Sequence, residues 1–94
     1  QPSGSGCDHG WGGHHLVVGS AVQGGIYGHM PTMALGGPDD ANNRGVWIPT
    51  ISTAQMGATL GKWFGATAQE LDYVFPNLSA FSASEFGVDV GFMG

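Results

Sequence analysis

The sequence predicts an α/β segment that lacks most of its own sheet. Residues 16–22 form a short apolar run rich in β-branched side chains, which is typical of a strand buried on both faces. Residues 53–64 and 67–75 each have a helix-start signal and apolar side chains at helical spacing. Because one or two short strands do not make a stable sheet, we expect protein outside this chain to complete it.

The composition also indicates a part of something larger. Of the 94 residues, 18 are glycine and only 10% are charged, whereas about 25% is typical of a domain. Apolar residues make up 41%, too many for a disordered segment. We therefore expect residues 1–94 to be the C-terminal part of a single larger α/β domain. They would pack against the remainder of the parent chain or against another subunit.

The charge pattern excludes some classes of partner. The net charge is −5, and the basic residues Arg44 and Lys62 lie far apart in the sequence. A nucleic-acid-binding surface needs clustered basic residues, so we expect no nucleic-acid partner. No apolar run approaches the roughly 20 residues of a membrane span. The single cysteine, Cys7, has no partner in the chain for a disulfide.

Residues 16–50 are expected to contain the strands and an irregular excursion between them. The first strand covers 16–22, and a short edge strand covers 46–48, directly before a proline. Between them, glycine, proline, aspartate and asparagine cluster at 36–40 and 42–45, which indicates turns.

A helical pair is expected over residues 52–75. Ser52 and Gln55 have the spacing of a capping box before the first helix, and Gly65 lies where a C-terminal glycine belongs. The apolar side chains of this helix fall on one stripe, formed by Met56, Leu60, Trp63 and Phe64.

The second helix of the pair is shorter. Thr67 and Glu70 form another capping box, and Pro76 ends the helix. Its apolar residues are Leu71, Val74 and Phe75. Residues 76–94 have scattered aromatic side chains without a strong period, so we expect a tail that wraps over a surface.

The chemistry of the chain is concentrated in its first segment, residues 1–15. Within eight residues, a loop loosened by glycines carries one carboxylate and three imidazoles, on Asp8, His9, His14 and His15. Carboxylate and neutral imidazole are the ligands that Zn²⁺ and Mn²⁺ favour. This pattern predicts a site for a divalent metal ion: Zn, Mn, Mg or Ca.

A structural interpretation of the same residues remains open. Asp8 could cap a turn and hydrogen-bond to His9, without any metal. His14 and His15 are neighbours, and neighbouring side chains alternate between faces of an extended chain, so at most one of them should enter a given site.

Other candidate residues favour structural roles. Cys7 could act as a nucleophile with His9 as its base, but the negative charge of Asp8 would raise the pKa of the thiol. His29 stands alone in the sequence, so a structural or solvent-exposed role is expected for it. Asp39 and Asp40 lack the alternating spacing of a calcium loop, so we expect a solvated turn at these two residues.

Several motifs, in order along nearly the whole chain, resemble the C-terminal region of the DUF1501 family. They are CDHGWGGHHLVVGSAVQGGIYG at 7–28, PTMALGGPDD at 31–40, RGVWIPT at 44–50, ATLGKWFG at 58–65 and VFPNL at 74–78. Members of this family are several hundred residues long and often have a twin-arginine export signal. The resemblance therefore implies an exported protein, located in the periplasm or outside the cell.

The DUF1501 family is similar to the alkaline phosphatase and sulfatase superfamily. That resemblance implies a three-layer α/β fold with metal ions at the carboxyl ends of the strands. Asp8 and His9 match the late Asp-His ligand pair of the superfamily, and His14 or His15 matches a further histidine before a strand. The superfamily nucleophile lies near the start of the domain and so falls outside this chain.

Two functions follow as expectations. In the first, the chain belongs to a metal-dependent hydrolase of phosphate or sulfate esters. In the second, it belongs to a secreted binding or structural protein that has kept the fold without catalysis. A shared fold does not decide between them.

Overall fold

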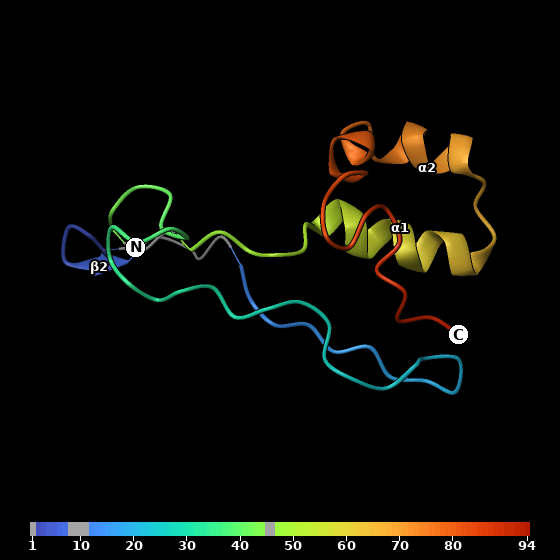
Figure 1. Ribbon diagram of the computed structural model, residues 1–94, viewed down its shortest axis with the longest axis horizontal. Helices are drawn as coiled ribbons and strands as arrows, with labels where there is room; N and C mark the ends of the chain where they lie inside the picture. Colours follow the sequence, from blue (N-terminus) through green and yellow to red (C-terminus); the bar gives the residue numbers. More distant parts are fainter. Residues whose placement is uncertain (1, 8–11, 45–46) are drawn as a thin grey trace. The chain divides into compact units, whose positions relative to one another are not determined.

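The computed structural model describes residues 2–7, 12–44 and 47–94, and the chain divides into two compact units (Figure 1). The first unit comprises Gln1–Leu16 and Gly28–Thr50, and the second comprises Val17–Tyr27 and Ile51–Gly94. Among the described residues, no helix is long and apolar enough to cross a membrane.

The first unit contains a small antiparallel hairpin and irregular chain. Strand β1 (Pro2–Ser3) pairs with strand β2 (Gly6–Cys7), with Pro2 opposite Cys7. Gly4 makes the turn between them with a φ of 57°, a left-handed conformation that glycine adopts at little cost. The sequence predicted only a loop here, because a hairpin of two-residue strands has no hydrophobic alternation to detect.

The predicted strand at 16–22 is not formed. Val22 makes a single antiparallel bridge to Met93, and the side chain of Val18 is 93% exposed. A strand is stabilised by its neighbours in a sheet, and the described residues supply none along most of this segment. Residues 16–22 therefore have the side chains of a buried strand, but most of them are not buried.

The predicted edge strand at 46–48 is reduced to a local pairing. Val46 lies outside the described residues, while Trp47 bridges to Asp40 and the Ile48 N–H donates to the Asp39 carbonyl (2.8 Å). The predicted turn before it is confirmed, because the Gly37 N–H donates to the Ala34 carbonyl at 2.8 Å.

Helix α1 (Thr53–Phe64) has the bounds that the sequence predicts. The Ser52 side chain accepts from the Gln55 N–H (3.1 Å), and the Gln55 side chain accepts from the Ser52 N–H (2.8 Å). Gly65 ends the helix in the left-handed conformation, with a φ of 114°. Both predicted end signals are confirmed.

The buried face of α1 only partly follows the apolar stripe, since Met56 and Leu60 are half-buried. The buried residues of this helix are Gln55, Ala58 and Thr59. In contrast, the side chains at the end of the predicted stripe lie at the surface, with Trp63 52% and Phe64 86% exposed. Within the second unit, α1 therefore packs through its small and polar residues, and part of its apolar stripe is left without cover.

Helix α2 (Ala68–Val74) and the 3₁₀ helix η1 (Leu78–Phe81) complete the helical core. The capping box of Thr67 and Glu70 is confirmed at the start of α2. Ala58, Leu71 and Leu78 form the buried cluster, with Ala54, Ala66 and Phe75 packed against it. Figure 1 shows α1 and α2 side by side.

The tail after η1 returns across α1, as a wrapping segment should. Val90 and Phe92 are buried, and Phe92 meets Tyr27 edge-on at 5.8 Å between ring centroids. The Gly94 N–H donates to the Ala21 carbonyl (2.6 Å), so the tail connects α1 to residues 21–27 of the same unit.

Candidate metal-binding segment

The candidate ligands lie on residues 8–15, which follow β2 in the chain. Asp8 and His9, the predicted ligand pair, lie outside the described residues, so their role stays a prediction. His14 and His15 are described, and both are exposed on irregular chain. Their imidazoles are therefore accessible to an ion from solvent.

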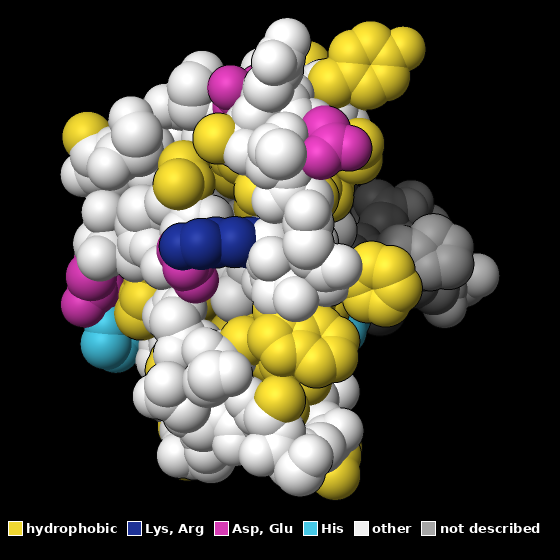
Figure 2. Space-filling model, turned by 90° about the vertical axis from the view of Figure 1, so that its right-hand side faces the viewer, with side chains coloured by type: hydrophobic (Ala, Val, Ile, Leu, Met, Phe, Trp, Pro, Cys, Tyr) yellow, Lys and Arg dark blue, Asp and Glu magenta, His cyan; other side chains and the backbone are white. Residues whose placement is uncertain are grey.

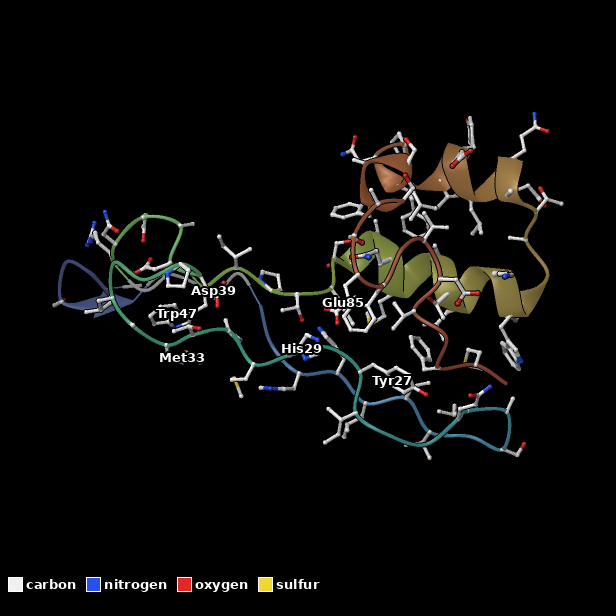
Figure 3. The ribbon with its side chains drawn as sticks, in the orientation of Figure 1. Tyr27, His29, Met33, Asp39, Trp47 and Glu85 are labelled. Carbon is white, nitrogen blue, oxygen red and sulfur yellow. The ribbon has the colours of Figure 1, made fainter. Side chains whose placement is uncertain are left out.

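Two histidine-bearing stretches of the first unit lie against the same short segment, Pro49 and Thr50. A side chain added at Gly12 would place its Cβ 3.4 Å from Cβ of Pro49. The His29 N–H donates to Thr50 Oγ1 (2.9 Å), and that hydroxyl donates back to the His29 carbonyl at 3.3 Å (Figure 3). The sequence carried no signal for this arrangement, because it depends on residues more than twenty positions apart.

The described residues do not form a metal site by themselves. Among them, no group of three or more His, Cys, Asp or Glu side chains is placed to share one ion. A zinc site usually has at least three protein ligands. His14 and His15 have suitable chemistry, but an ion bound there would need further donors beyond those described.

The acidic turn at 36–44 uses its carboxylates to hold the backbone. Asp39 Oδ2 accepts from the Thr32 N–H (2.6 Å), and Asp40 Oδ2 accepts from the Gly36 N–H (3.1 Å). The other oxygen of Asp40 accepts from the Asn42 N–H at 3.2 Å. The expectation of a turn is confirmed, but Asp40 is only 9% exposed and so is not the solvated residue that was expected.

The thiol chemistry considered from the sequence gains no support. The backbone of Cys7 pairs with Pro2 in the hairpin, and its candidate base, His9, lies outside the described residues. His29 is exposed, and its backbone is engaged with Thr50.

The electrostatic setting of the first unit is simple. Its basic residue Arg44 lies in the acidic turn, where its N–H donates to the Asn42 side chain (3.0 Å). No basic cluster that would attract a polyanion is present in the sequence of this unit.

Comparisons with known protein families, with curated proteins and with solved structures find no match for this chain.

Proposed function

We propose that this chain is the C-terminal segment of an exported, alkaline-phosphatase-like hydrolase of phosphate or sulfate esters. The observation that carries the proposal is the ligand-rich run at 8–15, in which both described histidines are exposed. Asp8, His9 and one of His14 and His15 would hold a divalent ion: Zn, Mn, Mg or Ca. When bound, such an ion stabilises negative charge on the transferring group and the leaving oxygen.

The rest of the proposed site lies in protein outside this chain. The nucleophile and the remaining ligands would come from the parent chain or from another subunit. Each unit exposes large apolar side chains that such a partner could cover. They include Met30, Met33 and Leu35 in the first unit, and Trp63, Phe64, Tyr73 and Val74 in the second. Figure 2 shows large hydrophobic side chains at the surface on one face.

Elemental analysis of the intact, purified protein tests the metal site. We expect one of the four metals at a stoichiometric level, and we expect a chelator to lower the thermal stability. A metal-free protein whose melting is unchanged in chelator would rule out the hydrolase proposal.

Substitutions locate the ligands within the loop. Asp8→Asn and His9→Asn should each reduce metal content and Zn²⁺ affinity by about 10-fold or more, because a ligand is lost. His14→Asn and His15→Asn should differ from each other, because adjacent side chains alternate between faces. His29→Asn is the matched control and should retain the metal.

A non-catalytic binding protein is the second candidate. It is favoured by the large apolar side chains that both units expose. In that case the exposed apolar side chains would be the functional feature. The two candidates separate in the elemental analysis, since only the hydrolase requires the metal.

A further inference from the structure

The C-terminal residues 84–94, here called the clasp, contact two parts of the second unit: α1 and residues 21–27. One side of the clasp rests on α1, and its end lies against residues 21–27 (Figures 1 and 3). It contains no helix or strand of its own. Its position is therefore determined by the contacts that it makes with these two neighbours.

Side chains of α1 hold the first half of the clasp through polar contacts. Gln55 Nε2 donates to Ser84 Oγ (3.0 Å) and to the Gly87 carbonyl (2.7 Å). The Val90 N–H donates to Thr59 Oγ1 at 2.9 Å. Lys62 Nζ adds an ion pair to Asp89 Oδ2 (2.9 Å). All of these polar groups can bind water instead when the clasp separates from α1.

The end of the clasp pairs with residues 21–23 in the manner of an added strand. The Gln23 N–H donates to the Phe92 carbonyl (2.7 Å), and the Gly94 N–H donates to the Ala21 carbonyl (2.6 Å). Val22 and Met93 form the antiparallel bridge between these two bonds. Residues 92–94 thus show what this backbone edge accepts: an extended, uncharged segment with apolar side chains.

The buried cluster of the helices contains no residue of the clasp. It consists of Ala58, Leu71 and Leu78, and the residues packed against that cluster also precede residue 84. Val90 and Phe92 are buried but lie outside this cluster. Opening of the clasp would expose Val90 and Phe92 but would remove no residue of this cluster, as a local opening independent of global unfolding requires.

We propose that the clasp is an autoinhibitory strap that opens as one unit and exposes the edge at residues 21–23 to a partner strand. The partner has the chemistry of residues 92–94: an extended, uncharged peptide strand with apolar side chains that pairs through its backbone. Such strand addition obtains its affinity from main-chain hydrogen bonds and its specificity from alternate side chains. This proposal does not depend on the metal site.

Hydrogen exchange tests whether the clasp opens independently. Thr59→Val keeps the shape of the side chain but removes the acceptor of the Val90 N–H, whereas Thr59→Ser retains it. We expect Thr59→Val to accelerate exchange of the Gln23, Val90 and Gly94 amides about five- to tenfold, with the α2 amides unchanged. Thr59→Ser should match the unmodified protein. Acceleration throughout α2, or none at the three amides, would overturn the proposal.

A peptide in trans tests whether the edge accepts a strand. A synthetic peptide of residues 88–94 should bind the Thr59→Val protein more tightly than the unmodified protein and shift the amide resonance of Gln23. The same peptide with Gly94→Pro is the control, because it lacks the N–H that pairs with Ala21. If neither protein binds the first peptide, or if both peptides bind equally, the edge is not a docking site for a strand.

Discussion

Gln55 takes part in two structural tasks at once. Its Oε1 accepts the Ser52 N–H at the start of α1, and its Nε2 donates to the clasp. The side chain is only 1% exposed, so water does not readily replace these partners in the folded state. A single buried amide therefore links the helix start to a segment some thirty residues away in the sequence.

Replacement of Gln55 by leucine should expose this dual role. Gln55→Leu leaves the Ser52 N–H and the Gly87 carbonyl without their partner, and an unsatisfied buried polar group costs about 1–3 kcal/mol. We expect the α1 amides to lose about this much protection, measured by native-state hydrogen exchange of the intact protein. Gln69→Leu, on the exposed surface of α2, is the control and should change little. Equal effects of the two substitutions would show that the buried contacts of Gln55 contribute nothing.

Glu70 makes the start of α2 sensitive to pH. Its carboxylate accepts from the Thr67 N–H (2.9 Å), and Thr67 Oγ1 accepts from the Glu70 N–H (3.2 Å). The hydrogen bond to the Thr67 backbone, followed by that to its side chain, lowers the pKa of Glu70 below its ordinary value of 4.5. A carboxyl group with a lowered folded-state pKa stabilises the fold above its unfolded pKa, and that contribution is lost as the pH falls through the folded value.

We therefore expect the helicity of α2 to decrease as the pH falls below 4.5, and Glu70→Gln to remove this part of the pH dependence. Carbon-13 NMR titration of the Glu70 carboxyl measures its pKa directly. Thr67→Ala should raise the titration midpoint of the Glu70 carboxyl toward its ordinary value. The substitution removes the Thr67 hydroxyl, which bonds to Glu70 and maintains the geometry of the capping box. Thr53→Ala, at an exposed position in α1, should leave the midpoint in place. An unchanged titration midpoint in Thr67→Ala would show that Thr67 does not lower the pKa of Glu70.

At the scale of elements, glycines determine how closely α1 and α2 approach. A Cβ added at Gly57 would lie 2.5 Å from Phe75 Cζ, and one at Gly61 would lie 2.9 Å from Leu71 Cδ2. Glycine within a helix normally costs about 0.5–1 kcal/mol relative to alanine. Here the absence of a side chain lets α2 and the residue after it lie close to α1.

Gly57→Ala should reverse the usual effect of such a substitution. We expect a loss of about 1–2 kcal/mol, because the new methyl group displaces the Phe75 ring and strains the packing. In a Phe75→Ala background the same substitution should become stabilising, because the clash is gone and only the helix propensity remains. Native-state hydrogen exchange of the α1 amides, in the intact protein with each of the four combinations, gives the coupling. Additive effects would mean that the ring and the glycine do not interact.

Sequence reasoning succeeded for α1 and α2 because their signals are local. Ser52, Gln55 and Gly65 each act on backbone groups within a few residues, so their spacing alone located the ends of α1. The strand expected at 16–22 depends on neighbouring strands that no local pattern supplies. The apolar stripe of α1 did not indicate its buried residues for a related reason. Which side of a helix becomes buried depends on what covers it, and here the clasp and α2 cover the small and polar side.

The candidate metal site has the same limitation. The residue types at 8–15 predict metal chemistry, but coordination depends on donors brought together from distant parts of the fold. Asp8 and His9 therefore stay a prediction, which the elemental analysis and the ligand substitutions can decide.

At the scale of the whole molecule, both units expose large apolar side chains to solvent. Val18 and Ile26 are almost fully exposed in the second unit, as is Leu16 in the first. Single exposed apolar residues are common on proteins, but so many large ones in a chain with 10% charged residues favour association. Residues 16–22 have the sequence of a buried strand, but Leu16 and Val18 are exposed as in a surface loop. This combination is expected if another protein segment covers residues 16–22 in the assembled protein.

Residues 1–94 expressed alone should therefore be insoluble or unfold without a single cooperative transition. The buried apolar residues are few, and the chain divides into two units, so little couples the unfolding of one part to the other. Circular dichroism and an intrinsic tryptophan signal, recorded during the same thermal scan, should give broad and non-coincident curves. Addition of the proposed partner, once identified, should sharpen both curves and merge them. A sharp two-state melt of the isolated chain, identical by both probes, would show that it needs no covering partner.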